Sequence, residues 1–169
     1  LSTVYTASAT TFAVSATKAQ IPPSSNGGNT VCTGIVANST TGFLIGPAPG
    51  RASSFIFATE GGTISGWANA VDPLKAQMGV DNSVAGAVYK GLALVTTPNP
   101  QLYAANFKTG TIDVFDATWK PVTLAAGSFT DPGVPAGFAP FNIQNLGGKM
   151  YVTYAKQGTD KVFDSPGVG

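Results

Sequence analysis

The chain has 169 residues, a formal net charge of +1 and no histidine; 43% of its residues are hydrophobic and 10% are charged. The low charge content excludes an intrinsically disordered chain, and nine scattered Lys and Arg residues exclude the clustered basic surface that nucleic acids require. No apolar stretch approaches the roughly 18 residues of a membrane-spanning helix. Abundant glycine and proline, 21 and 12 residues, favour a turn-rich all-β protein.

The chain begins with LSTVYTAS at 1–8, a run typical of a β-strand, with no initiator methionine before it. We therefore expect the 169 residues to be a processed or partial chain. Cys32 is the single cysteine, which excludes an internal disulfide. We expect a buried, apolar role for this thiol; a reactive thiol and an intermolecular bridge are the alternatives.

The next strand run starts at Thr33 and ends in the polar stretch ANSTTG. Asn38 begins an Asn-Ser-Thr sequon there, which is a candidate glycosylation site if the source is a eukaryotic secretory protein. Further along, residues 69–78 have the best helical pattern in the chain. Pro73 lies inside that pattern, so the sequence predicts a loop followed by a strand instead of a helix.

A pattern of strand, turn and strand recurs along the chain. FIFATEGGTISGW (55–67) aligns with LYAANFKTGTIDVF (102–115), because both have an apolar strand, a turn leading into Thr-Ile and an aromatic end. MYVTYAKQGTDKVFD (150–164) is a third copy, whose Val-Phe-Asp close predicts a strand over 162–164. The copies start about 48 residues apart. A short apolar strand precedes each copy, starting at Thr33, Lys90 and Phe141.

This period is typical of a β-propeller blade with four strands. The sequence therefore predicts an all-β fold with a partial blade at 1–32, blades at 33–89 and 90–140, and a partial blade at 141–169. A β-sandwich with chance internal similarity is the alternative. Because a closed propeller needs at least about four blades, we expect this chain to be part of a larger ring. Open end faces lead us to expect that the isolated piece folds poorly.

Four segments resemble a family of uncharacterised, secreted, mainly bacterial β-propellers with six blades: SSFIFATEGGTISGW, DNSVAGAVYKGLAL, LYAANFKTGTIDVFD and GSFTDPGVPAGFAPFNIQNLGGKMYVTYAKQ. The resemblance covers about residues 33–157. It implies an extracellular or cell-surface location and a shape related to NHL-repeat and gluconolactonase-like propellers. The family carries no established activity. This chain departs from it by lacking the further blades expected on both sides.

Side chains that differ between the copies are candidate ligand-binding residues. One set occupies equivalent places just after the second strand of each copy: Glu60, Asn106 and Lys156. A second set enters the first strands and is expected at the same end of the propeller: Tyr89, Lys90 and Asn142. Gluconolactonase-like propellers hold a metal ion at this end through Glu, Asn and Asp side chains, and the set here departs from that pattern. A binding face without metal and plain solvated loops both remain open.

Most acids lie beside turn-forming residues, where Asp usually fixes the turn through its own backbone: Asp72, Asp81, Asp131, and the repeated pair Asp116 and Asp164. Asp113 lies within the third strand of its copy. Most aromatic residues fit the core between blades, and Trp119 and Phe138 are candidate carbohydrate-stacking rings. The lack of histidine excludes Ser-His and Cys-His nucleophiles and His-based zinc sites.

These patterns favour a non-enzymatic, secreted or cell-surface β-propeller module for binding or structural assembly. Its partners would be an unidentified protein or carbohydrate and the remaining blades, with no nucleic acid and no membrane span. No residue is assigned as catalytic and no cofactor is expected, although a divalent ion such as calcium would suit the alternative. That alternative is a metal-dependent hydrolase or lactonase of the gluconolactonase-like type, with the metal on the Glu60 face.

Overall fold

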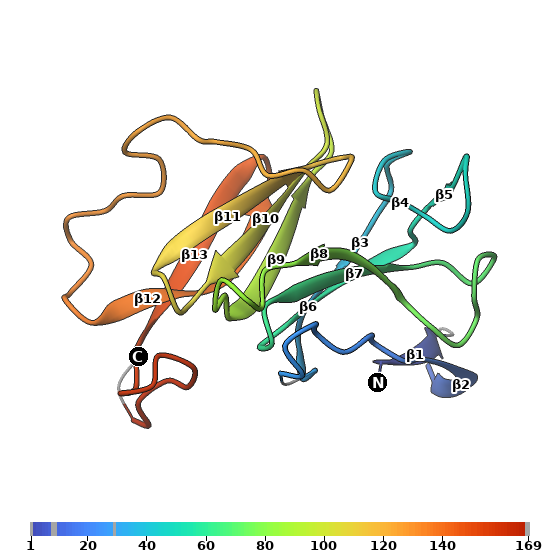
Figure 1. The fold of residues 1–169 in the computed structure, drawn as a ribbon, viewed down its shortest axis with the longest axis horizontal. Helices are drawn as coiled ribbons and strands as arrows, with labels where there is room; N and C mark the ends of the chain where they lie inside the picture. Colours follow the sequence, from blue (N-terminus) through green and yellow to red (C-terminus); the bar gives the residue numbers. More distant parts are fainter. Residues whose placement is uncertain (1, 8–9, 29, 168–169) are drawn as a thin grey trace.

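The computed structural model describes residues 2–7, 10–28 and 30–167, and over these ranges the chain is all-β, as predicted. Its strands form several small antiparallel sheets, none of which closes on itself (Figure 1). Within these ranges, no helix is long and apolar enough to cross a membrane. The run predicted at 1–8 forms β1 (Ser2–Ala7), which pairs with β2 (Phe12–Ala19); Leu1 and Ser8 lie outside the described residues.

The first large sheet, here called sheet one, has four strands in the order β3–β6–β7–β8. Its strands are β3 (Cys32–Ala37), β6 (Phe55–Thr59), β7 (Thr63–Trp67) and β8 (Gln77–Asp81). In the chain, a small separate hairpin of β4 (Leu44–Ile45) and β5 (Arg51–Ala52) connects β3 to β6. Residues 69–76 form a loop and β8 follows, so the prediction of a loop and a strand in place of a helix is confirmed.

Two further sheets follow in the chain. Sheet two consists of β9 (Tyr89–Val95), β10 (Gln101–Asn106) and β11 (Thr111–Asp116). Sheet three is the pair β12 (Phe138–Leu146) and β13 (Lys149–Lys156). The predicted first and second strands of all three copies are therefore present, although sheets two and three begin slightly earlier than the predicted blade boundaries at 90 and 141.

The third copy does not complete its predicted pattern, because residues 162–164 form no strand. The Oδ1 atom of Asp160 accepts hydrogen bonds from the main-chain nitrogens of Val162 and Phe163, at 2.9 and 3.2 Å. This local bonding folds residues 160–163 into a turn. The chain then pairs back on the end of β13, because Asp164 forms an isolated antiparallel bridge with Gln157 and Gly158 N donates to the oxygen of Phe163 at 2.8 Å. The predicted third strand is thus reduced to a single bridge.

The first strands of the three sheets lie next to one another, with β9 between β3 and β12 (Figure 1). Glycine permits this close approach at both contacts. A Cβ atom on Gly34 would lie 3.0 Å from the main-chain nitrogen of Leu92, and one on Gly91 would lie 2.9 Å from the Cα of Asn142. The sheets then diverge and stack through their faces.

Each interface between sheets buries one set of alternating side chains. Between sheets one and two lie Ile56, Ala58, Ile64, Leu92, Leu102, Ala104 and Phe115. Between sheets two and three lie Ala93, Ala105, Ile112, Val114 and Ile143. Sheet two is thus covered on both faces, which is why its strands carry nearly continuous apolar runs instead of strict alternation.

Trp119 does not offer the exposed ring expected for carbohydrate stacking. Its indole packs edge to face on Phe43, with ring centroids 5.0 Å apart, and its Nε1 donates to the main-chain oxygen of Leu44 at 3.0 Å. A Cβ atom on Gly79 would lie 2.5 Å from the indole, so the ring covers β8 directly. Trp119 therefore ties the turn after β11 to sheet one. Phe138, the other candidate ring, is half-buried in β12.

Candidate functional site

Four of the six predicted ligand-binding residues come together at one end of the interface between sheets one and two: Glu60, Tyr89, Lys90 and Asn106. Tyr89, Lys90 and Asn106 are buried, with 0%, 8% and 3% of their surface exposed. They bind other residues of the chain instead of forming the open binding face that the sequence suggested. Repetition indicated that they lie near each other, but it gave no signal that they face inward.

Lys90 extends from β9 and forms an ion pair with Glu60, in the turn after β6. Both side chains are largely shielded from solvent, with 5% and 10% exposed. Three aromatic rings surround the ammonium group, with centroids 5.5 to 5.7 Å from Nζ: Phe107, Phe141 and Phe163. A cation that loses its water gains from such rings and from a carboxylate partner. The cluster joins sheet one to sheets two and three.

The second cluster centres on Asp113 in β11. Its Oδ2 atom accepts hydrogen bonds from the Tyr89 hydroxyl at 3.0 Å and the Asn106 amide at 2.9 Å. Thr111 donates to the other carboxylate oxygen at 3.1 Å, and Asn82 donates to the Tyr89 hydroxyl at 2.8 Å. Burial and the neighbouring carboxylate raise the pKa of Tyr89 far above its ordinary value, so the phenol stays neutral.

The remaining predicted residues lie apart from these clusters. Asn142 and Lys156 are exposed on sheet three. Asn38 uses its amide nitrogen to donate to the main-chain oxygens of Gly42 and Ser53, at 3.1 and 2.9 Å. Its Oδ1 accepts from the hydroxyl of Thr40 at 2.7 Å. A glycan on Asn38 would compete with these donations, which favour a structural role for the sequon.

Other acids and the cysteine have the structural settings expected of them. Asp72 accepts from the main chain of Leu74 and Lys75, and Asp131 accepts from that of Gly133, so the predicted turn roles are confirmed. Cys32 is a free, half-buried thiol, and burial raises its pKa. In the described ranges no three His, Cys, Asp or Glu side chains are placed to share a metal ion.

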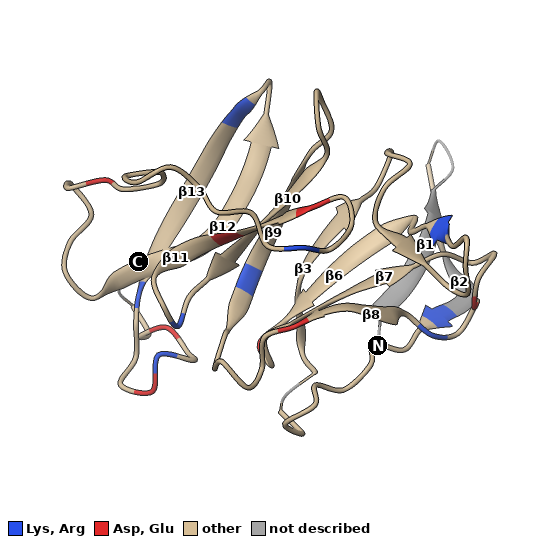
Figure 2. Ribbon diagram, turned by 45° about the horizontal axis from the view of Figure 1, so that its top comes forward, with Lys and Arg blue, Asp and Glu red and all other residues tan. Residues whose placement is uncertain are grey.

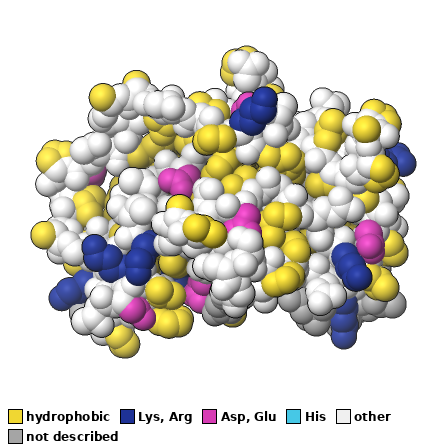
Figure 3. Space-filling model, in the orientation of Figure 1, with side chains coloured by type: hydrophobic (Ala, Val, Ile, Leu, Met, Phe, Trp, Pro, Cys, Tyr) yellow, Lys and Arg dark blue, Asp and Glu magenta, His cyan; other side chains and the backbone are white. Residues whose placement is uncertain are grey.

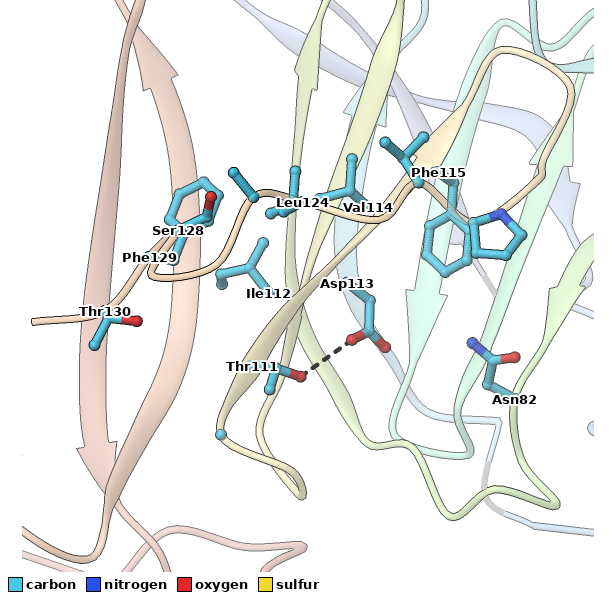
Figure 4. Close-up of a pocket in the computed structure, with 14 residues that line it drawn as sticks. Asn82, Thr111, Ile112, Asp113, Val114, Phe115, Leu124, Ser128, Phe129 and Thr130 are labelled. Carbon is cyan, nitrogen blue, oxygen red and sulfur yellow. Dashed lines mark hydrogen bonds between the residues drawn. The ribbon is translucent and has the colours of Figure 1, made fainter.

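A groove of about 350 Å³ opens beside the Asp113 cluster, along the outer edge of β11 (Figure 4). On one side of the strand, Asp113 points toward Asn82; on the other, Ile112 and Val114 lie near Leu124 and Phe129 (Figure 4). The far wall is the segment after β11, residues 121–130. The sequence reasoning treated Asp113 only as a strand residue and so missed this site.

Only part of the outer edge of β11 is hydrogen-bonded. Asp116 N donates to the oxygen of Lys120, and Val122 N donates to the oxygen of Val114, both at 2.8 Å. Because alternate residues of a strand direct their main-chain groups to the same edge, Ile112 faces outward as Val114 and Asp116 do. Within the described ranges the Ile112 main chain has no partner on that edge. The groove therefore lies where a neighbouring strand would fit.

Charged residues are spread over many strands and loops of the chain (Figure 2). The face in Figure 3 likewise mixes small basic, acidic and apolar groups. A second groove, of about 480 Å³, runs between the three first strands, and none of the described residues that line it is charged. Among the described residues that line the β11 groove, Asp113 is the single charged one.

Three similar curated proteins are uncharacterised proteins of Acanthamoeba polyphaga mimivirus. The chain is 32% identical to protein L690 over 146 residues, which is 81% of this chain and 38% of L690. It is 33% identical to protein R640 over 125 residues, 69% of this chain and 22% of R640. For protein R648 the identity is 31% over 131 residues, 75% of this chain and 30% of R648.

The chain thus spans between about a fifth and two-fifths of the length of the curated relatives it matches. No family model matches the chain, and no solved structure does. The resemblance to secreted bacterial propellers remains a prediction.

Proposed function

We propose that the chain is a portion of a β-propeller that acts as a non-enzymatic binding and assembly module. The observation that carries this proposal is the arrangement of three consecutive antiparallel sheets with their first strands β3, β9 and β12 side by side. Blades of a propeller share this arrangement, with the first strand of each blade innermost. The four strands of sheet one match a complete blade.

The length of the relatives supports a larger ring. Each curated relative extends well beyond the matched region, which leaves room for further sheets. Tyr151 in β13 is 53% exposed and alternates with Met150 and Val152, which pack on sheet two, so its ring would gain from contact with a further sheet. The further blades are accordingly part of the proposal, as partners within the same protein.

The buried polar clusters support a structural use of the side chains that an enzyme would need. Glu60, the residue that would hold a metal ion in a gluconolactonase-like hydrolase, is paired with Lys90. Tyr89 and Asn106 are committed to Asp113. A hydrolase would need such groups free to reach a substrate, so these contacts favour the binding module over the hydrolase.

Two measurements test this function. Elemental analysis and lactone hydrolysis assays on the purified protein should show no stoichiometric divalent ion and no turnover, in the wild type and in Glu60→Ala alike. A bound divalent ion that is lost in Glu60→Ala, together with lactone hydrolysis, would overturn the proposal. The intact mass of the protein from its natural source gives the true chain length.

The propeller part of the proposal has a separate test, a crystal structure of the natural full-length protein. We expect the additional sheets to continue the row circularly, with β3, β9 and β12 facing a central channel. A sandwich, in which the exposed faces of sheets one and three pack on a single opposing sheet, would contradict it. A secreted or cell-surface location, which the family resemblance adds, is tested by fractionation of the source.

A further inference from the structure

We propose that the groove along β11 binds an extended peptide segment of a partner protein, which adds as a strand beside Ile112 and places a lysine or arginine near Asp113. This inference rests on the proposed binding function and specifies one site and one class of partner for it. It depends on the free strand edge, the shape of the groove and the uncompensated charge of Asp113.

Comparison with sheet one identifies the strand that sheet two lacks beside Ile112. Thr63-Ile64 in β7 is the repeat equivalent of Thr111-Ile112 in β11. In sheet one, β8 covers that position, because Thr63 pairs with Asp81 and Ile64 with Val80. In sheet two the segment after β11 pairs only opposite Val114 and Asp116 and then turns away. A strand of a few residues would complete the pattern, and strand addition to an exposed edge is a common mode of peptide recognition.

The two sides of the groove define the pattern of the peptide. Side chains on one face of an added strand would meet Ile112, Val114, Leu124 and Phe129, which are apolar. Side chains on the other face would meet Asp113 and Asn82. Because successive side chains of a strand point to opposite faces, the fitting peptide alternates an aliphatic residue with a polar one.

Asp113 determines which polar side chain the bound peptide should carry. The donors around its carboxylate, Tyr89, Asn106 and Thr111, are all neutral. Within the part of the chain that the structure describes, the single ion pair is that of Lys90 with Glu60, so no cation balances Asp113. A half-buried carboxylate held by neutral donors attracts a cation more strongly than an exposed one would. A basic side chain is therefore the complementary group.

The experiment uses the fluorescently labelled peptide acetyl-Thr-Val-Lys-Val-Thr-amide and measures its anisotropy with the full chain. Matched probes carry Thr or Glu in place of Lys, and a fourth probe is N-methylated at its two valine amides, which are the ones that face β11 when valine lies opposite Ile112. We expect the Lys probe to bind about tenfold more tightly than the Thr probe, and the Glu probe to bind weakest. Salt should weaken the Lys probe and leave the Thr probe nearly unchanged. N-methylation should abolish binding, because it removes these main-chain donors.

Asp113→Asn should lower the affinity for the Lys probe to that for the Thr probe. Asp164→Asn is the matched control, since it removes the same charge from an exposed acid after β13 that does not line the groove, and it should leave binding unchanged. If Asp113→Asn unfolds the chain, the probe series on the wild type still decides. Equal binding of the Lys and Glu probes, equal effects of both variants, or no binding of the Lys probe at millimolar concentration would overturn the inference. None of these results bears on the metal and lactone assays, which test the proposed function separately.

Discussion

Sheets one and two start from the same repeat and differ at their outer edge. In sheet one, β8 pairs along the outer edge of β7, and the faces of β7 pack on sheet two and on Ala19 and Ile21, so that β7 is fully buried. In sheet two, the outer edge of β11 is hydrogen-bonded only along its second half, and the rest of that edge borders a groove. The difference shows that the repeat fixes the inner strands of each sheet, whereas the connecting segment decides whether the outer edge is closed or free to bind.

The largest effect is expected from breaking the contact between these two sheets. Lys90→Met removes the ammonium group that pairs with the largely buried Glu60 carboxylate, which should lower the free energy of unfolding by about 4 kcal/mol. Urea denaturation measures this loss. Lys149→Met, at an exposed lysine of sheet three, is the control and should change stability little. The double variant Glu60→Gln/Lys90→Met should recover part of the loss, and a single variant as stable as the control would contradict the structural role of the pair.

A matched pair of core substitutions compares the free energy of unfolding in sheet one, which has the fourth strand β8, with that in sheet two, which has none. Ile64→Ala should cost about 3.5 kcal/mol, since Ile64 is completely buried between sheets one and two, beside Val80 of β8. Ile112→Ala should cost about 2 kcal/mol, because the 8% exposed side chain borders the groove and its neighbours can relax. The comparison of the two unfolding free energies is the test. A larger loss at Ile112 would mean that the edge of β11 is as tightly packed as that of β7.

The smallest expected effect is on the stability of the fold at acidic pH, through Asp81 at the end of β8. Hydrogen bonds from Ser83 and from the main chain of Ser25 lower the pKa of Asp81 to about 2. A carboxyl group with a lowered pKa stabilises the fold above its ordinary pKa, near 4, and this contribution disappears as the pH falls toward 2. Asp81→Asn should therefore flatten the pH dependence of stability in that window, by under about 1 kcal/mol because the group is exposed. An unchanged acid profile would refute this role.

The strand pattern was predictable because apolar runs and glycine turns mark the first two strands of each copy. The strand expected at 162–164 is reduced to an isolated bridge between Asp164 and Gln157, because the Asp160 side chain forms a local turn that the repeat pattern conceals. Sheet stacking was predictable from the repeat, whereas the number of strands per sheet depended on the connecting segments, which do not repeat.

At the candidate site, repetition grouped Glu60, Tyr89, Lys90 and Asn106 correctly near one end of two sheets. Their inward orientation depends on contacts between residues about 30 positions apart, such as the pair of Lys90 with Glu60. Equivalence between copies carries no information about such contacts. One signal for Asp113 was available, since alternation in β11 places it opposite the face of Ile112 and Val114, where an acid between apolar strands is unusual.

The first strands of the three sheets differ at one equivalent position, which is glycine in β3 and β9 and asparagine in β12. Gly34 makes room for β9, and Gly91 makes room for β12. The corresponding residue of β12 is Asn142, and a Cβ atom on Gly91 would lie 2.5 Å from its Oδ1. The same oxygen accepts a hydrogen bond from the main-chain nitrogen of Ile143 at 2.8 Å. A larger residue at position 91 would therefore displace a bound amide as well as the main chain of β12, whereas the nearest atoms to one at position 34 would be those of Gly91 and Leu92.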